Sequence, residues 1–272
     1  MNSTGIEWVD YSWNPIVGCS EMSEGCENCY AKFMSWRVGS IAQDRGDEEI
    51  AKKYFRTVTE RGKRWTGRIA VFNRRFEEPL RMKNRLRGKG VFVCSMGDLF
   101  HHNVDNWIRD WIFEVIQEIP WTTFVILTKR PYALLEYWSD RNQEDRFQNV
   151  WFGVTAENQK RADERIPVLQ DIPDVAVRFV SAEPLLERVD FSPYMRGRRG
   201  IDWIIVGAET GAGARPFDIS WGYEILTSAR RYRVPFFFKK LRGRGKSSYP
   251  PKDLLVRKFP KPREIGGDLW RR

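Results

Sequence analysis

The stretch VFVCSMGDLFHHNVDNWIRDWIFEVIQEIPWTTFVILT, residues 91–128, contains the repeating unit that decides the fold. Two short apolar runs, residues 91–95 and 123–128, flank a segment whose apolar side chains recur at helical spacing. They form one stripe: Trp107, Ile108, Trp111, Ile112, Val115, Ile116 and Ile119. A strand, an amphipathic helix and a second strand in this order predict a βαβ crossover, which joins two parallel strands.

Similar apolar runs recur along the rest of the chain. With the two above, they span residues 68–73, 91–95, 123–128, 150–155, 177–182, 203–208 and 234–239. The runs are almost continuously apolar, which is typical of strands covered on both faces of a parallel sheet. With an eighth strand ending near residues 16–19, they predict an α/β fold with a parallel (β/α)8 or incomplete TIM-type barrel, and an open doubly wound sheet is the alternative.

The pattern also suggests how the chain is divided. We expect the barrel domain to cover residues 1–240, with a polar helical insertion at residues 32–66. Residues 241–272 are rich in Arg, Lys, Pro and Gly, and we expect this C-terminal extension to wrap the surface or to stay mobile.

The charge balance favours a polyanionic partner. The 272 residues include 46 Lys and Arg against 36 Asp and Glu, which gives a net charge of +10. Such an excess favours nucleic acid or nucleotide binding through phosphate contacts. The longest apolar runs are shorter than the roughly 20 residues that cross a bilayer. The four cysteines and the absence of an apolar N-terminal segment predict a cytoplasmic protein without a membrane anchor.

Three of the four cysteines, Cys19, Cys26 and Cys29, are spaced C-x6-C-x2-C in one loop. Structural zinc needs four ligands, so Cys94, His101 or His102 would have to complete that site. A [4Fe–4S] cluster held by three thiolates leaves one iron open to a small molecule. Three buried free thiols are the remaining alternative.

The ordered motifs carry a family resemblance. They are WNPIVGCSEMSEGCENCYA, VFVCSMGDLF, LTKRP, VWFGVTAEN, VSAEPLL, WIIVGAETGAGARPFD and VPFFFKK, from about residue 5 to residue 240. Together they resemble the phage-associated three-cysteine-motif family, which is radical-S-adenosylmethionine-like, and more loosely the spore photoproduct lyases, which act on a DNA base lesion. The resemblance implies a [4Fe–4S] cluster on Cys19, Cys26 and Cys29, with S-adenosylmethionine on the open iron. The first two cysteines are three residues further apart than is usual in that superfamily, and Tyr30 follows the last cysteine instead of preceding it.

Polar side chains follow almost every predicted strand, where barrel enzymes keep their chemistry. By barrel position, we expect Ser95 and Asp98 near the methionine amino group or ribose of S-adenosylmethionine, and Lys129 at its carboxylate. The other candidate cofactor-binding residues, around the ribose and adenine or at the strand end that follows, are Thr155, Glu157, Ser181, Glu183 and Glu209. Capping of the following helices is the alternative role for Ser95, Thr155 and Ser181.

The remaining candidates are cations, a thiol and two histidines. Carboxylates repeated at one barrel mouth would repel each other unless cations such as Lys129, Arg130, Arg215 and Lys239 offset them. Arg130 and Arg215 are the candidate substrate-binding residues, the latter beside the glycine-rich segment 207–216 that is able to cradle a phosphate. Cys94, as a hydrogen-atom donor, and Lys239 are the candidate catalytic residues, whereas we expect His101 and His102 to be surface groups at a helix start.

The leading hypothesis is therefore a radical S-adenosylmethionine enzyme that modifies or repairs a nucleic-acid base or nucleotide. It would need an electron donor such as flavodoxin or ferredoxin, and a partner protein encoded nearby is conceivable. A nucleic-acid-binding protein with structural zinc, and a metal-dependent hydrolase that uses the carboxylates, are the competing hypotheses.

Overall fold

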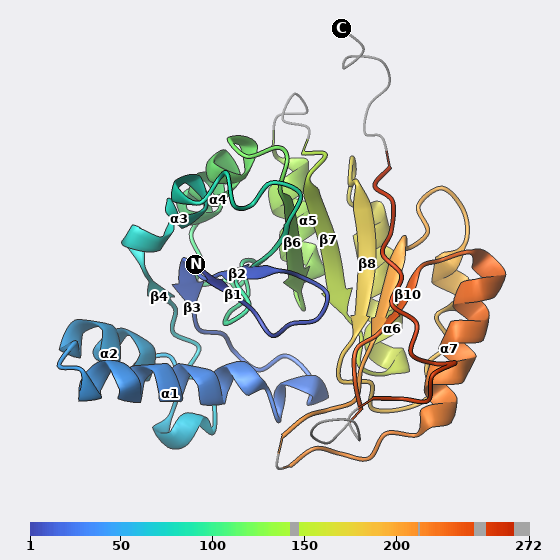
Figure 1. Cartoon of the computed structure of the whole chain (residues 1–272), viewed down its shortest axis with the longest axis horizontal. Coiled ribbons are helices and arrows are strands. Elements are labelled where there is room, and N and C mark those ends of the chain that lie inside the picture. Colours follow the sequence, from blue (N-terminus) through green and yellow to red (C-terminus); the bar gives the residue numbers. More distant parts are fainter. Residues whose placement is uncertain (142–146, 212, 242–248, 264–272) are drawn as a thin grey trace, which may run out of the picture. The chain divides into compact units, whose positions relative to one another are not determined.

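The computed structural model describes residues 1–141, 147–211, 213–241 and 249–263 (Figure 1). The chain has two compact units, Met1–Ile126 and Leu127–Arg272, here called unit 1 and unit 2. The boundary falls inside one strand. The predicted division at residue 240 stays a prediction, and the extension that was expected there lies partly outside the described residues.

Unit 1 contains the beginning of a mostly parallel sheet. Its strands, in sheet order, are β1 (Asn2–Ser3), β2 (Tyr11–Trp13), β5 (Gly90–Val93) and β6 (Thr123–Thr128). β2 and β5 are parallel with Ser12 opposite Phe92, and β5 and β6 are parallel with Phe92 opposite Val125. The predicted crossover helix is α4 (Asn106–Gln117), so the βαβ unit is confirmed, although Trp107 on its stripe is half exposed.

Two predicted barrel strands are wrong in their placement. Residues near 16 and 70 do form strands, β3 (Ile16–Val17) and β4 (Ala70–Val71), but these pair antiparallel in a separate two-stranded sheet. Directly after β3, Gly18 has a φ of 117° and forms a parallel bridge with Gly97, where the pairing with β4 has ended. The strand that pairs with β5 is instead β2, a three-residue segment too short to produce a sequence pattern.

The predicted helical insertion is confirmed. It is formed by α1 (Tyr30–Asp44) and α2 (Glu48–Phe55), which pack against each other (Figure 1). Asp47 caps α2, since its carboxylate accepts a hydrogen bond from the Ile50 amide. The short helices of this unit are η1 (Glu24–Cys26), η2 (Glu60–Gly62), η3 (Asn73–Arg75) and α3 (Glu78–Arg81).

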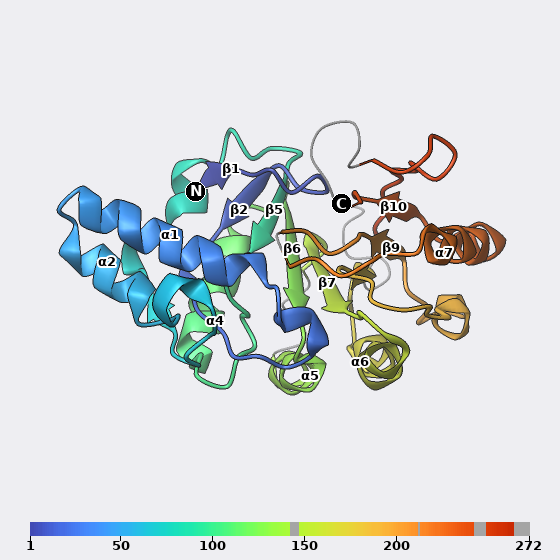
Figure 2. The ribbon, with the colours of Figure 1, turned by 90° about the horizontal axis from the view of Figure 1, so that it is seen from below.

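Unit 2 carries four parallel strands with helices between them. The strands, in sheet order, are β7 (Val150–Thr155), β8 (Val177–Ala182), β9 (Trp203–Val206) and β10 (Phe236–Phe238). Its helices are α5 (Pro131–Ser139), α6 (Gln159–Asp171), η4 (Ser192–Met195) and α7 (Ile219–Tyr232). Every residue of these strands is buried, as the continuous apolar runs predicted, and α6 and α7 lie along one side of them (Figure 2).

Within each unit the main strands are parallel, β2, β5 and β6 in unit 1 and β7 to β10 in unit 2. Each terminal strand already has an antiparallel neighbour in its own unit. β1 pairs with β2 through Asn2 and Ser12, while Arg257 forms an antiparallel bridge with Phe237 of β10. A closed (β/α)8 barrel is not shown, whereas the α/β class is confirmed.

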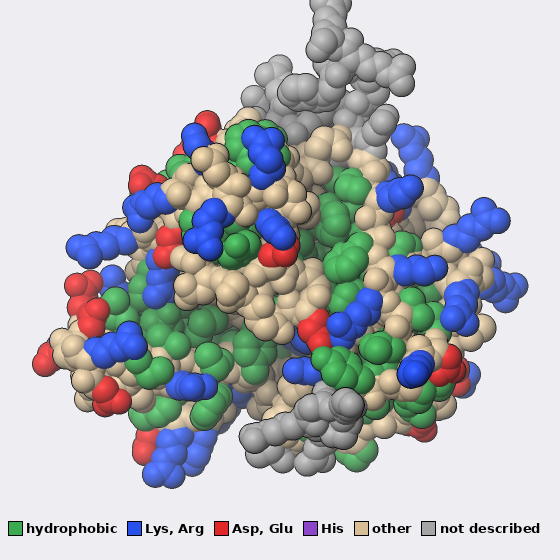
Figure 3. All heavy atoms as spheres, in the orientation of Figure 1, with side chains coloured by type: hydrophobic (Ala, Val, Ile, Leu, Met, Phe, Trp, Pro, Cys, Tyr) green, Lys and Arg blue, Asp and Glu red, His purple; other side chains and the backbone are tan. Residues whose placement is uncertain are grey.

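The surface is rich in cations, and Figure 3 shows Lys and Arg side chains gathered over the part of unit 2 that contains α7. Within the described ranges, no helix is both long and apolar enough to cross a membrane.

Candidate functional site

The cysteine loop is tied to the segment that follows β5. Gly18 and Gly97 form a parallel β-bridge, and the Gly18 amide donates to the carbonyl oxygen of Met96 at 3.0 Å. A Cβ at Gly18 would lie 2.2 Å from the carbonyl oxygen of Arg68, and its φ of 117° is unfavourable for any other residue. This position therefore requires glycine, and it sets the direction in which the cysteine loop leaves the sheet.

The three thiols lie on the loop between β3 and α1. Cys26 ends η1 and is buried, whereas Cys29 is the residue before α1 and, like Cys19, is partly exposed. Cys19 and Cys29 pack against one apolar cluster, formed by Ala31, Val58 and Trp65. Two of the three predicted ligands thus share one surface of unit 1.

Hydrogen bonds hold the sulfur atoms in their present positions. The Met22 amide donates to Sγ of Cys26 at 3.4 Å, and the Cys19 thiol donates to the carbonyl oxygen of Ser20 at 3.4 Å. Across the residues with a described placement, no group of three or more His, Cys, Asp or Glu side chains is arranged to hold a metal ion.

A buried lysine at the start of α1 contacts this loop, and the sequence pattern did not identify it as a site residue. Lys32 is 3% exposed, and its ammonium group donates to Glu21 Oε1 at 3.1 Å and to the carbonyl oxygen of Glu27 at 2.8 Å. It crosslinks both halves of the loop from the first turn of α1. The only signal in the sequence is its position three residues after Cys29.

Ser95 lies beside the loop, but its polar groups have protein partners. Its hydroxyl accepts a hydrogen bond from the side-chain Nδ2 of Asn14 at 3.1 Å, and Oδ1 of Asn14 accepts one from the Met96 backbone amide at 2.9 Å. Its carbonyl oxygen accepts from the hydroxyl of Tyr30 at 2.7 Å. The structure thus brings Ser95 and the cysteine loop together through Tyr30, with the Ser95 hydroxyl held by Asn14.

Cys94 and Asp98, in the segment that follows β5, are both buried. Cys94 is 3% exposed, and burial raises the pKa of its thiol, helped by the nearby Asp98 carboxylate. Asp98 accepts from the Phe100 amide at 3.0 Å and is 4% exposed. The Cys94 thiol therefore stays protonated over the physiological pH range, as a hydrogen-atom donor must.

The expectation that His101 is a surface group is wrong. His101 is fully buried, with Nδ1 accepting from the Asn103 amide at 3.1 Å and Nε2 lying 2.9 Å from the Ser20 hydroxyl. Since Nδ1 accepts, the neutral ring carries its proton on Nε2 and donates it to Ser20. His101 thus anchors the residue next to Cys19, while His102, stacked on its ring, is exposed.

In unit 2, each of the predicted carboxylates at the strand ends is paired with a cation. Glu157, after β7, is 0% exposed and lies 3.0 Å from Nζ of Lys129 and 2.9 Å from the guanidinium of Arg165. Arg165 also donates to the carbonyl oxygen of Thr155 at 2.8 Å. Both Glu157 oxygens are thus occupied, so this residue acts first as the centre of a buried ion network.

Glu183, after β8, makes the second pair. Its Oε1 lies 2.9 Å from Nζ of Lys239, and its Oε2 accepts from the hydroxyl of Ser181 at 3.0 Å. A Cβ on Gly207 would lie 3.1 Å from Glu183 Oε1 and 3.5 Å from Cβ of Lys239. Glycine at 207 therefore allows the close approach of the ends of three strands.

Glu209, after β9, makes the third pair. The Arg215 guanidinium lies 2.6 Å from one carboxylate oxygen of Glu209 and 2.9 Å from the other. This bidentate contact orients Arg215 within the glycine-rich turn. Arg130 is buried at the start of α5, where its amide donates to the Thr128 hydroxyl at 2.9 Å. The offset of carboxylates by Lys129, Arg215 and Lys239 thus agrees with the charge argument.

This arrangement defines a mixed α/β protein with a mostly parallel sheet and polar groups at the carboxyl ends of its strands. The fold resembles that of spore photoproduct lyase. A point mutant of that enzyme matches with a TM-score of 0.52 and 11% identity, over 88% of this chain and 78% of the other. Spore photoproduct lyase complexed with dinucleoside spore photoproduct matches with a TM-score of 0.51, 11% identity and the same coverage.

Over residues 3–271 the chain matches the family described as "Protein of unknown function (DUF5131)", and it belongs to that family. No curated protein matches the chain significantly.

Proposed function

We propose that the protein is a radical S-adenosylmethionine enzyme whose substrate is a nucleic-acid base or a nucleotide. The observation that carries this proposal is the three-cysteine loop, fixed by Gly18 and Tyr30 beside the carboxyl end of β5. In the resemblance noted from the sequence, such a loop holds a [4Fe–4S] cluster. Three thiols on one short loop, two of them partly exposed, form a donor set of the right chemistry.

The fold and the charge support the same proposal. The spore photoproduct lyase fold is known in complex with a dinucleoside, and the present chain shares that fold at 11% identity. Its net charge of +10 favours a phosphate-bearing substrate. When bound, the cluster and S-adenosylmethionine would supply a 5′-deoxyadenosyl radical, with an electron from a donor such as flavodoxin or ferredoxin.

In unit 1, the protein's own residues would hold and shape the cofactor site. Cys19, Cys26 and Cys29 would hold the cluster as thiolates. Lys32 links Glu21 to the carbonyl oxygen of Glu27 and so fixes the part of the loop that carries Cys26. Cys94, buried and protonated, would return a hydrogen atom to a substrate radical.

In unit 2, the pair of Glu183 and Lys239 is the best candidate to contact the cofactor. Their side chains are 12% and 25% exposed, so a ligand hydroxyl or carboxylate has access to both. Lys129 is 18% exposed and keeps the proposed contact with the methionine carboxylate, whereas Glu157 is fully enclosed. Arg215, oriented by Glu209 and 31% exposed, would contact a substrate phosphate.

The test is anaerobic reconstitution with iron and sulfide, followed by EPR of the reduced protein with and without S-adenosylmethionine. We expect a [4Fe–4S]⁺ signal that shifts when S-adenosylmethionine is added. The Ala variants of Cys19, Cys26 and Cys29 should each lose the cluster, while Cys94→Ala, the matched control, should keep it. Stoichiometric zinc without iron uptake, or a cluster that survives the loss of Cys26, would contradict the proposal.

A further inference from the structure

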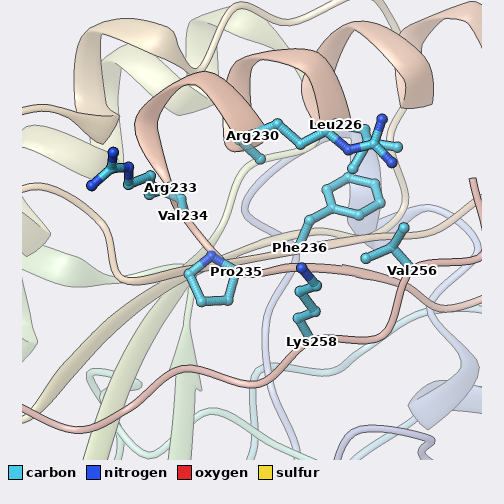
Figure 4. Close-up of a pocket in the computed structure, with 9 residues that line it drawn as sticks. Leu226, Arg230, Arg233, Val234, Pro235, Phe236, Val256 and Lys258 are labelled. Atoms are coloured by element: carbon cyan, nitrogen blue, oxygen red, sulfur yellow. The ribbon is translucent and has the colours of Figure 1, made fainter.

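Unit 2 contains a cavity at the amino end of β10, the opposite end of this strand from Lys239. The cavity measures about 340 Å³ and lies between the last turn of α7, the start of β10 and residues 256–258 (Figure 4). Its walls are apolar and are formed by Leu226, Ala229, Val234, Pro235, Phe236 and Val256. This volume falls at the lower end of the range of small-molecule sites and suits one nucleoside unit.

Three cations also line this cavity, which is called here the α7 pocket. They are Arg230 and Arg233 at the end of α7 and Lys258 from the C-terminal segment. All three are exposed, and no ion pair to an acidic side chain is found for them among the described residues. This contrasts with Lys129, whose charge is compensated by Glu157.

The positive surface continues beyond the pocket. Arg196 lies over the ring of Tyr232 at 4.9 Å, and Arg231 lies over the same ring at 5.6 Å. η4 packs against α7, and Arg198 is exposed in the loop that follows η4. Cations grouped around a partly buried tyrosine, whose hydroxyl accepts a hydrogen bond from Arg196, form a positive surface of the type that contacts the backbone of nucleic acids.

We propose that the α7 pocket and its cations bind a nucleic-acid strand, with phosphates on Arg230, Arg233 and Lys258 and one base in the apolar cavity. Like charges around one pocket without acidic partners repel each other, and a bound polyanion relieves this repulsion. The favourable interaction of a helix C-terminus with cations accounts for Arg230 and Arg233 but not for Lys258, which comes from another segment.

This inference goes beyond the proposed function, because it needs neither the cluster nor S-adenosylmethionine. It assigns a strand-binding surface to the end of β10 that is remote from Lys239. Its test therefore uses the full-length protein without cluster, so that failure of cluster assembly and failure of strand binding are separate results.

The probe is a fluorescently labelled single-stranded 12-nucleotide DNA, followed by anisotropy over a series of salt concentrations. The test variant changes Arg230, Arg233 and Lys258 to Gln, and the control changes Arg37, Arg45 and Lys63 to Gln. The control residues are exposed cations in unit 1, so both variants lose three charges. We expect the test variant to lower the slope of log K against log salt by about 2, at roughly 0.7 per lost phosphate contact. The control should keep the slope.

A second variant separates the cavity from its charges. Val256→Trp fills the cavity without a change of charge, and it should weaken binding at least several-fold while leaving the salt slope unchanged. Wild-type affinity in this variant would overturn the assignment of a base to the cavity. An equal loss of slope in the control and test variants would overturn the location of the phosphate contacts.

Competition identifies the form of the ligand. An unlabelled 12-mer should displace the probe at micromolar concentration, whereas a 5′-mononucleotide should need a far higher concentration. Displacement by both at equal concentration would contradict strand binding and leave a mononucleotide site instead. Melting curves of all variants check that they are folded.

Discussion

Loss of the charge on Glu157 should destabilise the protein strongly, because this carboxylate is the centre of a buried ion network. Its side chain is 0% exposed, and the guanidinium of Arg165, 2.9 Å away, is itself only 5% exposed. Glu157→Gln keeps the shape but leaves Arg165 buried without an anion. Breaking a buried pair in this way costs about 3–5 kcal/mol, and at roughly 2–4 °C per kcal/mol for a chain near this size the Tm falls by roughly 6–20 °C.

Lys129, the second cation in contact with Glu157, supplies the comparison. Lys129→Met leaves Glu157 paired with Arg165, and since the lysine head is partly exposed, we expect a cost of about 1 kcal/mol or less. The double variant Glu157→Leu with Arg165→Met removes both buried charges and should be more stable than Glu157→Gln alone.

Urea unfolding followed by tryptophan fluorescence measures all three variants, with an unchanged m-value as the sign that the unfolded states are comparable. The reasoning is refuted if Glu157→Gln lies within about 1 kcal/mol of the wild type, or if Lys129→Met is equally costly. Either result would mean that Glu157 is not restricted to a buried ion network that excludes water. Its predicted contact with the cofactor ribose would then regain support.

Three further perturbations follow from the same contacts. Gly207→Ala should cost about 1 kcal/mol in urea unfolding and weaken S-adenosylmethionine binding in calorimetry, because the added Cβ meets the Glu183 carboxylate. The pKa of the Cys94 thiol is raised in the folded state. The free energy of unfolding is therefore unaffected by this thiol below its unfolded-state pKa of about 8.5, and above that pH it falls by about 1.4 kcal/mol per pH unit. Cys94→Ala should remove that part of the alkaline loss, and identical pH profiles would contradict it. His101→Phe breaks the hydrogen bond to Ser20, so amide exchange in residues 19–29 should quicken, and unchanged exchange would exclude an anchoring role.

The strands that the sequence predicted well are those with long apolar runs. β6, β7 and β8 have the predicted bounds, since six consecutive residues that are all or mostly buried leave a strong pattern. β2 has only three residues and was missed, while β3 was placed in the wrong sheet. The pairing of β3 with β4 joins residues distant in the chain, Ile16 and Val71, and is not readable from local sequence.

The site was predicted unevenly for a similar reason. The position of a residue after a strand identified Glu157, Glu183 and Glu209, because the carboxyl ends of parallel strands share one edge. What each side chain contacts there depends on partners distant in sequence, such as Lys239, 56 residues after Glu183. Burial of Lys32 likewise follows from tertiary contacts, so these roles became visible only in the structure.

The location of the excess charge links the fold to the proposed functions. A net charge of +10 says that a polyanion is favoured but not where it binds. At the carboxyl ends of the strands in unit 2, Lys239 and Arg215 have their own carboxylates, so little uncompensated charge is left there. Around the α7 pocket, Arg230 and Lys258 have no such partner among the described residues. The affinity of the α7 pocket for a nucleic-acid strand should therefore depend steeply on salt concentration. Binding at the carboxyl ends of the β-strands, where the charges are paired, should depend on salt only weakly.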